Sequence, residues 1–256
     1  MKMNWKILCI GNSFSQDATR LMGQVALSSG VETVRIVNLY VPGCSVRMHW
    51  MHARKDLPVY RFEDFRGRNL MMTPNYRISQ ALVADDWDWI CIQQGSGDGS
   101  FYSREESYDC LPNLVEYIRN RVNPAARIAF PMTWVGETVN PRRELAFYDA
   151  DQACLFDRIA GVTNAVVAPQ VDKVCPVGTA VHNARADALG LMTRDGYHLS
   201  LGLGRFVAAM TLWCALTSTD VSQITWHPES VDAKQQAKAV ACVRRALAEP
   251  YRITKK

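Results

Sequence analysis

Residues 5–15 read WKILCIGNSFS, and the first strand-to-helix unit of the chain begins in this stretch. Trp5–Ile10 is an almost wholly apolar run that stops at Gly11, which is typical of a strand buried on both faces of a sheet. Apolar residues then recur at helical spacing over Gln16–Ser29. The stretch therefore predicts a buried strand that leads through a short turn into a helix.

The same alternation continues along the chain. Further apolar runs of strand length lie at Val34–Val41, Trp87–Ile92, Arg127–Phe130 and Ala165–Ala168. Segments with helical character follow them, at Leu111–Val122, Arg142–Ala160, Thr179–Leu189, Leu203–Thr217 and Ser230–Ala248. This order predicts an α/β fold in three α/β/α layers: a doubly wound, flavodoxin-like parallel sheet of about five strands with helices on both faces. Because no internal repeat or linker divides the chain, residues 1–256 are predicted to form a single domain.

An insertion at about residues 47–74 interrupts this alternation. Within it, Arg47–Arg68 carries six basic residues against three acidic ones, interleaved with aromatic side chains. Long irregular segments in compact domains are often lids or binding loops. The sequence leaves two alternatives open, a solvated loop tacked to the body by its aromatic residues or a lid that holds a sugar ring or an acidic acyl donor.

Composition excludes several classes of protein. With 48% hydrophobic and 21% charged residues the chain resembles an ordered globular protein, and no apolar stretch is long enough to cross a membrane. A net charge of +4 over 256 residues is too weak to indicate nucleic-acid binding. The eight cysteines show no metal-binding spacing and several lie in apolar runs, so we expect them to be reduced. The start of the chain has no signal-peptide pattern, so a cytoplasmic location is expected, although a chain trimmed from a secreted protein would look the same.

Polar and small residues directly follow four of the predicted strands, at 11–15, 42–45, 93–97 and 132–134. Ligands in open α/β sheets bind outside the carboxyl ends of the strands, so we expect these four segments to converge on one rim. A further polar cluster, Arg194–Ser200, lies between two helical segments near the end of the chain.

Ser13 and His198 suggest acyl transfer. A serine hydroxyl becomes a nucleophile when a base takes its proton, and the base works best when a carboxylate orients it. Ser13 lies at a strand-to-helix turn, where backbone N–H groups can also stabilise an oxyanion. His198 is the candidate base, and Asp195, three residues earlier, can orient its ring. The structural alternatives are that Ser13 caps the helix and that Asp195 and His198 form a hydrogen bond within a loop.

These blocks, in this order, resemble those of the SGNH (GDSL-like) hydrolases. The resemblance covers about residues 5–215 and is closest to a branch with a GNSFS opening, a Gln-Gln strand end and a DGYHLS closing block. It implies that Ser13 is the nucleophile, that His198 is the general base and then acid, and that Asp195 orients His198. It also implies that the backbone N–H groups of Ser13 and Gly43 form part of the oxyanion hole.

The third block departs from the family pattern. SGNH hydrolases usually carry Gly-x-Asn-Asp there, and the Asn amide donates to the oxyanion, whereas this chain reads Gly95-Ser96-Gly97-Asp98. A Gln amide can donate as an Asn amide does. We therefore predict Gln94 as the replacement donor, with Gln93 as the fallback, although both could instead satisfy backbone groups at the end of the sheet.

Four further residues are candidates for the pocket wall: Asn12, Gln93, Ser96 and Trp134. Trp134 could equally belong to the core. His49 and His52 share one helical face, but no partner in the sequence completes a recognisable metal site, so neither a metal nor another cofactor is predicted.

The predicted function is that of a serine esterase that removes a small acyl group, most readily acetyl, from a polyhydroxylated substrate such as a carbohydrate. Two alternatives stay open: an esterase or thioesterase for lipid-like acyl chains, and a carbohydrate-binding protein that kept the fold but lost catalysis. The expected partner is a small-molecule or carbohydrate ester, with no nucleic acid or membrane, and the oligomeric state is not predicted.

Overall fold

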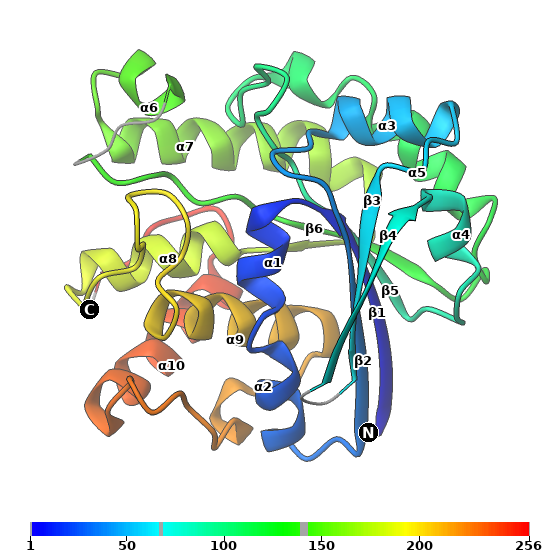
Figure 1. Cartoon of the computed structure of the whole chain (residues 1–256). Coiled ribbons are helices and arrows are strands. Elements are labelled where there is room, and N and C mark those ends of the chain that lie inside the picture. The colour runs from blue at the N-terminus through cyan, green and yellow to red at the C-terminus, as the bar shows by residue number, and fades with distance from the viewer. Residues whose placement is uncertain (1, 67–68, 139–142, 256) are drawn as a thin grey trace.

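A seven-stranded mixed sheet runs through the middle of the structure, a computed structural model that describes residues 2–66, 69–138 and 143–255 (Figure 1). The strands lie in the order β4-β3-β2-β1-β5-β6-β7. They are β1 (Asn4–Gly11), β2 (Thr33–Tyr40), β3 (Tyr60–Arg66), β4 (Asn69–Tyr76), β5 (Trp89–Ile92), β6 (Arg127–Pro131) and β7 (Lys173–Cys175). Strands β2, β1, β5, β6 and β7 run parallel to one another. The other two extend the sheet at one edge, where β3 is antiparallel to β2 and β4 is antiparallel to β3.

Helices connect the strands and cover the sheet. The α-helices are α1 (Ser13–Thr19), α2 (Met22–Ser28), α3 (Val46–Arg54), α4 (Ile78–Leu82), α5 (Leu111–Arg119), α6 (Arg143–Phe147), α7 (Gln152–Val162), α8 (Val177–Ala186), α9 (Leu203–Thr217) and α10 (Ala233–Ala248). Shorter helical turns are η1 (Glu105–Tyr108), η2 (Thr163–Val167), η3 (Ala168–Gln170) and η4 (Val221–Gln223). Within the described ranges, no helix combines the length and apolar character needed to traverse a bilayer.

Each face of the sheet has its own hydrophobic core. Helices α1, α2, α8, α9 and α10 cover one face, and α3, α4 and α5 cover the other (Figure 1). Alternate residues of β1 serve the two cores: Ile7 and Cys9 belong to the first, and Leu8 and Ile10 belong to the second. The apolar run that opens the chain is therefore continuous because both faces of its strand are buried.

The expected three-layer α/β/α fold is confirmed, but the expected five-stranded parallel sheet is wrong in two places. Four predicted strands match β1, β2, β5 and β6 to within about two residues. Ala165–Ala168, expected as a strand, is helical, and the strand follows it as β7. A short apolar run cannot be assigned to strand or helix from periodicity alone. The helix expected at Arg142–Ala160 corresponds to α6 and α7, and Arg142 lies outside the described residues.

The second error concerns residues 47–74, expected to be irregular. The segment holds most of α3 and the hairpin β3–β4, which extends the sheet beyond β2, while residues 67–68 lie outside the described part of the chain. Tyr60 and Phe62 are buried, and Phe62 packs against Tyr76 with ring centroids 4.3 Å apart. The aromatic residues thus hold an edge hairpin in place, and charged residues such as Asp64 pair with Arg35 of β2. A role as a lid stays a prediction.

Candidate active site

Ser13 begins α1 directly after β1, and Asn12 shapes the turn between them. The Asn12 Oδ1 accepts a hydrogen bond from the Phe14 N–H at 2.9 Å, so Asn12, rather than Ser13, caps the helix. The Asn12 Nδ2 donates to the backbone carbonyls of Cys44 and Gln94, each at 3.0 Å. One buried amide therefore ties together the ends of three neighbouring strands and leaves the Ser13 hydroxyl to other partners.

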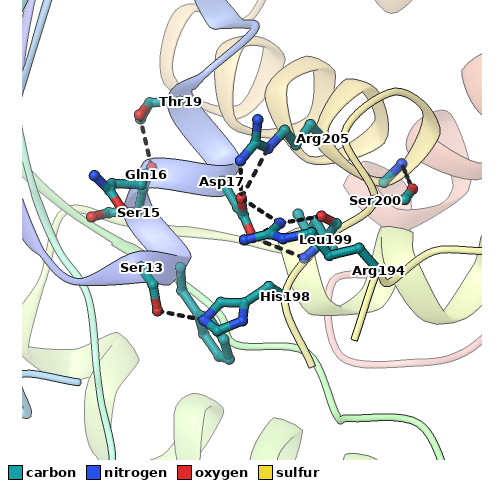
Figure 2. Close-up of polar contacts among 12 residues, drawn as sticks. Ser13, Ser15, Gln16, Asp17, Thr19, Arg194, His198, Leu199, Ser200 and Arg205 are labelled. Atoms are coloured by element: carbon teal, nitrogen blue, oxygen red, sulfur yellow. Dashed lines mark hydrogen bonds and ion pairs between the residues drawn. The ribbon is translucent and has the colours of Figure 1, made fainter. Parts of the chain in front are cut away.

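The structure brings Ser13, His198 and Asp195 together, although Ser13 and His198 are 185 residues apart in sequence (Figure 2 shows the contact between Ser13 and His198). The His198 Nε2 lies 3.0 Å from the Ser13 Oγ, and the His198 Nδ1 lies 2.6 Å from the Asp195 Oδ2. The other oxygen of Asp195 accepts backbone N–H groups of Tyr197 and His198, at 2.9 and 2.7 Å. These bonds hold the carboxylate in one orientation against the imidazole.

The same contacts determine the ionisation of Asp195. Burial alone would raise the pKa of this carboxyl group, but the hydrogen bonds from the His198 ring and from the two backbone N–H groups outweigh burial and lower the pKa to about 2. Asp195 is therefore a carboxylate at neutral pH. A carboxylate in this place favours the imidazole tautomer that leaves Nε2 free to accept a proton from Ser13.

Glycines line the rim opposite Ser13. Gly43 has a φ of +61°, a left-handed conformation that favours glycine, and its carbonyl accepts the Gly97 N–H at 2.8 Å. A Cβ on Gly95 would lie 2.4 Å from the Gly43 carbonyl oxygen, closer than real contacts allow. The loops after β2 and β5 can approach one another this closely because both carry glycines at the contact.

A cavity of about 500 Å³ opens beside Ser13 and His198. Its lining includes apolar side chains: Phe14, Trp134, Val135, Leu145, Leu155 and Ile159. Polar side chains line it as well: Asn12, Ser96, Tyr102, Glu144 and Tyr197. The cavity can therefore receive a ligand with both an apolar and a hydroxyl-rich portion.

Of the predicted wall residues, Asn12, Ser96 and Trp134 line the cavity. Trp134 is also part of the core: it is 1% exposed, stacks on Phe14 at a centroid distance of 4.2 Å and donates its indole N–H to the Tyr197 carbonyl at 2.8 Å. Trp134 therefore packs in the core and also lines the cavity.

Gln94 does not reach the cavity. Its Oε1 accepts backbone N–H groups of Val46 and Gly95, at 2.8 and 3.1 Å, and its Nε2 donates to the Ser107 carbonyl at 3.1 Å. Gln93 is directed elsewhere too, since its Nε2 contacts the Pro131 carbonyl and the Thr133 hydroxyl at 3.3 and 3.2 Å. Gln93 thus satisfies groups at the end of β6, and Gln94 satisfies backbone groups at the start of α3, at Gly95 and in η1.

Two tyrosines at the cavity were not predicted from the sequence. The Tyr102 and Tyr197 hydroxyls are 2.6 Å apart, and each lies within 3.5 Å of the Ser96 hydroxyl. The sequence does contain a sign that Tyr197 belongs to the site, because this residue lies between Asp195 and His198 in the closing block. No sequence pattern marks Tyr102, because it belongs to an irregular segment that only the tertiary fold places beside the closing block.

No group of three or more His, Cys, Asp or Glu side chains in the described part of the chain is arranged to hold a metal ion. His49 and His52 instead lie near Cys44 and Tyr60 in a buried cluster away from the cavity lining.

Comparison with solved structures shows which class of proteins shares this fold. The chain is similar to a putative SGNH hydrolase from Slackia heliotrinireducens, with 18% identity and a TM-score of 0.55 over 83% of this chain and 99% of that one. It is also similar to a member of the lipolytic protein G-D-S-L family from Veillonella parvula DSM 2008, with 15% identity and a TM-score of 0.51 over 81% and 95% of the two chains. The fold is thus the three-layer α/β fold of SGNH hydrolases.

The family can be named more closely. Residues 6–246 match the model of DUF4886, a domain of unknown function, and the chain belongs to this family. The crystal structure of a DUF4886 family protein from Bacteroides uniformis ATCC 8492 is 32% identical, with a TM-score of 0.92 over 98% of this chain and 97% of that one. A search of curated proteins gave no match.

Proposed function

We propose that the protein is a serine esterase with Ser13 as nucleophile, His198 as general base and acid, and Asp195 as the orienting carboxylate. The observation that supports this most directly is the continuous series of contacts from Asp195 through His198 to Ser13, which ends at the mouth of a cavity. The 3.0 Å contact between the His198 Nε2 and the Ser13 Oγ lies within the range needed for proton transfer, and the 2.6 Å contact with Asp195 orients the ring.

In the proposed reaction the Ser13 Oγ attacks the ester carbonyl carbon while its proton moves to the His198 Nε2. Asp195 holds the imidazole in place and stabilises the imidazolium that forms. When the tetrahedral intermediate collapses, the ester C–O bond breaks and the alcohol leaves with the proton from His198. Water then attacks the acyl group on Ser13, with His198 again as the base, and the carboxylic acid and the free serine are released.

The oxyanion of this reaction needs donors near the carbonyl. We propose the backbone N–H groups of Ser13 and Gly43, because Ser13 is the first residue of α1 and the N–H groups of a first helical turn lack partners within the helix. Gln94 is not part of this proposal, because its amide is engaged with Val46, Gly95 and Ser107.

The proposed substrate carries a small acyl group, most readily acetyl, on a polyhydroxylated alcohol such as a carbohydrate. The hydroxyls of Ser96, Tyr102 and Tyr197 support this choice, because they can exchange hydrogen bonds with sugar hydroxyls at the cavity. Tyrosine rings also present flat apolar faces against which a sugar ring can pack.

A second candidate is an esterase for longer acyl chains. The apolar side chains that line the cavity, Trp134, Val135 and the leucine and isoleucine of α7, support it, since an acetyl group would leave much of their surface uncovered. The two candidates share the nucleophile and differ only in the acyl group.

A chain-length series tests both candidates. The wild type and Ser13→Ala would be assayed with p-nitrophenyl acetate, butyrate and octanoate and with acetylated sugars. Loss of turnover in Ser13→Ala is expected with every ester, and highest kcat/KM with acetate favours the first candidate over the second. Undiminished turnover in Ser13→Ala would contradict the nucleophile. A wild type that neither turns over nor reacts with a fluorophosphonate probe would instead indicate a binding protein on this fold.

A further inference from the structure

Asp17 lies one helical turn after Ser13 in α1, on the same face of the helix. Figure 2 shows its carboxylate directed toward the loop that carries His198. The residue is only 1% exposed. A carboxylate buried to this extent is costly unless charged groups and hydrogen-bond donors surround it.

Such partners surround Asp17. The Arg194 Nη1 lies 3.0 Å from each carboxylate oxygen, and the Leu199 backbone N–H donates to Oδ2 at 2.8 Å. Arg205 of α9 approaches from another side, with its Nη2 at 2.7 Å and its Nε at 2.9 Å from Oδ1. Two guanidinium groups and one peptide N–H therefore converge on a single buried carboxylate.

The two loop partners have a particular position in the sequence. Arg194 directly precedes Asp195, and Leu199 directly follows His198. The Arg194 N–H also donates to the His198 carbonyl at 2.8 Å, and Thr193 pairs with Leu199 in an antiparallel bridge. The buried carboxylate thus holds both ends of the short segment that presents the base and its orienting acid.

Arg205 provides a comparison within the same cluster. Its side chain connects the carboxylate to α9, which packs against α1, whereas the side chain of Arg194 connects it to the loop of His198. The two arginines therefore separate two effects of one carboxylate: helix packing through Arg205, and placement of the loop through Arg194.

We infer that Asp17 is a positioning residue that keeps the His198 Nε2 within hydrogen-bonding distance of the Ser13 Oγ. The inference rests on the proposed function, in which that contact transfers the proton. Since the nucleophile and the anchor lie one turn apart on the same face of α1, a movement of α1 carries the His198 loop with it. A general base displaced by about 1 Å can cost about 100-fold in rate.

The test compares Asp17→Asn and Arg194→Met with Arg205→Met and with a remote control. Asp187→Asn is the matched control: it neutralises a carboxylate paired with Arg245 at 2.7 Å, on elements that contribute no residue to the cavity lining among the described residues. In Asp17→Asn and Arg194→Met we expect kcat to fall by about 10- to 100-fold, with KM changed less than about threefold. We expect Arg205→Met and Asp187→Asn to lower the melting temperature but to keep kcat within about threefold of wild type.

If Asp17 had a purely structural role, all four variants would have a changed melting temperature, and the folded fraction of each would have the same kcat. The inference is overturned if folded Asp17→Asn and Arg194→Met keep wild-type kcat, or if Asp187→Asn loses as much. If Asp17→Asn does not fold, Arg194→Met decides the question, because it retains the ion pair between Asp17 and Arg205.

Two further measurements distinguish a failure of this inference from a failure of the proposed function. The rate at which a fluorophosphonate labels Ser13 tests the proposed function, and amide hydrogen exchange at Leu199 tests the anchor. Inactive and unlabelled wild type would mean that the proposed function fails. Hydrogen exchange then still tests the anchor: faster exchange at Leu199 in Asp17→Asn, but not in Asp187→Asn, supports it, and unchanged exchange overturns it.

Discussion

Two clusters in this protein each place a histidine beside a potential nucleophile. In the first, His198 contacts the Ser13 hydroxyl and the Asp195 carboxylate at the cavity. In the second, the His49 Nδ1 lies 3.3 Å from the Cys44 Sγ and 2.8 Å from the Tyr60 hydroxyl, with His52 adjacent. Cys44 of the second cluster directly follows Gly43, but no residue of this cluster is among those that line the cavity.

Burial and the identity of the third partner separate the two clusters. His49 is fully buried, and burial, with a contribution from the neighbouring His52, lowers the pKa of His49 to about 3. Burial also raises the pKa of the Cys44 thiol to about 12, so neither group is charged at neutral pH. Hydrogen bonds to Asp195, in contrast, keep that carboxyl ionised beside His198. A base and a nucleophile in contact become a candidate active site only where a charged partner and access to solvent accompany them.

The largest expected difference between the clusters is in catalysis. We expect His198→Ala to lower kcat for p-nitrophenyl ester hydrolysis by about 10⁶-fold, because Ser13 then has no base. Cys44→Ala, which disturbs the buried cluster, should keep kcat within about threefold of wild type. Similar losses in the two variants would remove the distinction between the clusters.

A second prediction concerns the orienting carboxylate. Asp195→Asn retains the size of the side chain but favours the wrong imidazole tautomer, so we expect kcat to fall by about 10²- to 10⁴-fold. Tyr60→Phe, which removes the hydroxyl contacted by His49 and His52, is the matched change in the buried cluster and should leave kcat unaltered. Steady-state kinetics on both variants measure this, and an Asp195→Asn enzyme with wild-type kcat would contradict the assignment.

Thiol reactivity provides a third, smaller contrast. Cys154 is exposed, whereas Cys44 is buried with a raised pKa, so iodoacetamide should alkylate Cys154 in the folded protein and leave Cys44 unmodified. Peptide mass spectrometry before and after unfolding measures both sites. Rapid modification of Cys44 in the native state would indicate that this cluster is open to solvent.

A fourth contrast between the clusters is in acid stability. The pKa of His49 is lowered from 6.5 in the unfolded chain to about 3 in the native state, so the unfolded state binds a proton first as the pH falls. The stabilisation is complete above pH 6.5 and is lost progressively toward pH 3, by at most about 1.4 kcal/mol per pH unit. Denaturant unfolding across this range should show a shallower slope for His49→Gln than for the wild type. A slope in His49→Gln equal to that of the wild type would contradict this prediction.

Local patterns account for much of what the sequence predicted. The turn from β1 into α1 and four of the parallel strands were predictable, because each depends on a run of neighbouring residues. The hairpin β3–β4 was missed, since its aromatic residues are interleaved with charges that pair only once β2 lies beside them. The apolar run at Ala165–Ala168 predicts a strand, but most of it belongs to the helical turn η2, because a short apolar run fits either structure.

The candidate site likewise contains some residues that the sequence could indicate and others that it could not. Ser13, His198 and Asp195 were recognisable from the order of their blocks, whereas the donor role predicted for Gln94 depended on where an amide at a strand end points. Side chains of adjacent strand residues point to opposite faces, and neither Gln93 nor Gln94 turned out to face the cavity.

Apolar periodicity and block order are properties of neighbouring residues, so the layered α/β architecture and the candidates Ser13, Asp195 and His198 could be read from the chain alone. Tertiary contacts were needed to show that Asp17 contacts the loop of His198, that Tyr102 meets Tyr197, and that His49 is buried beside Cys44. These contacts join distant segments. Whether a polar side chain there is an anchor, a pocket wall or a neutral core group depends on burial and on partners that no local pattern specifies.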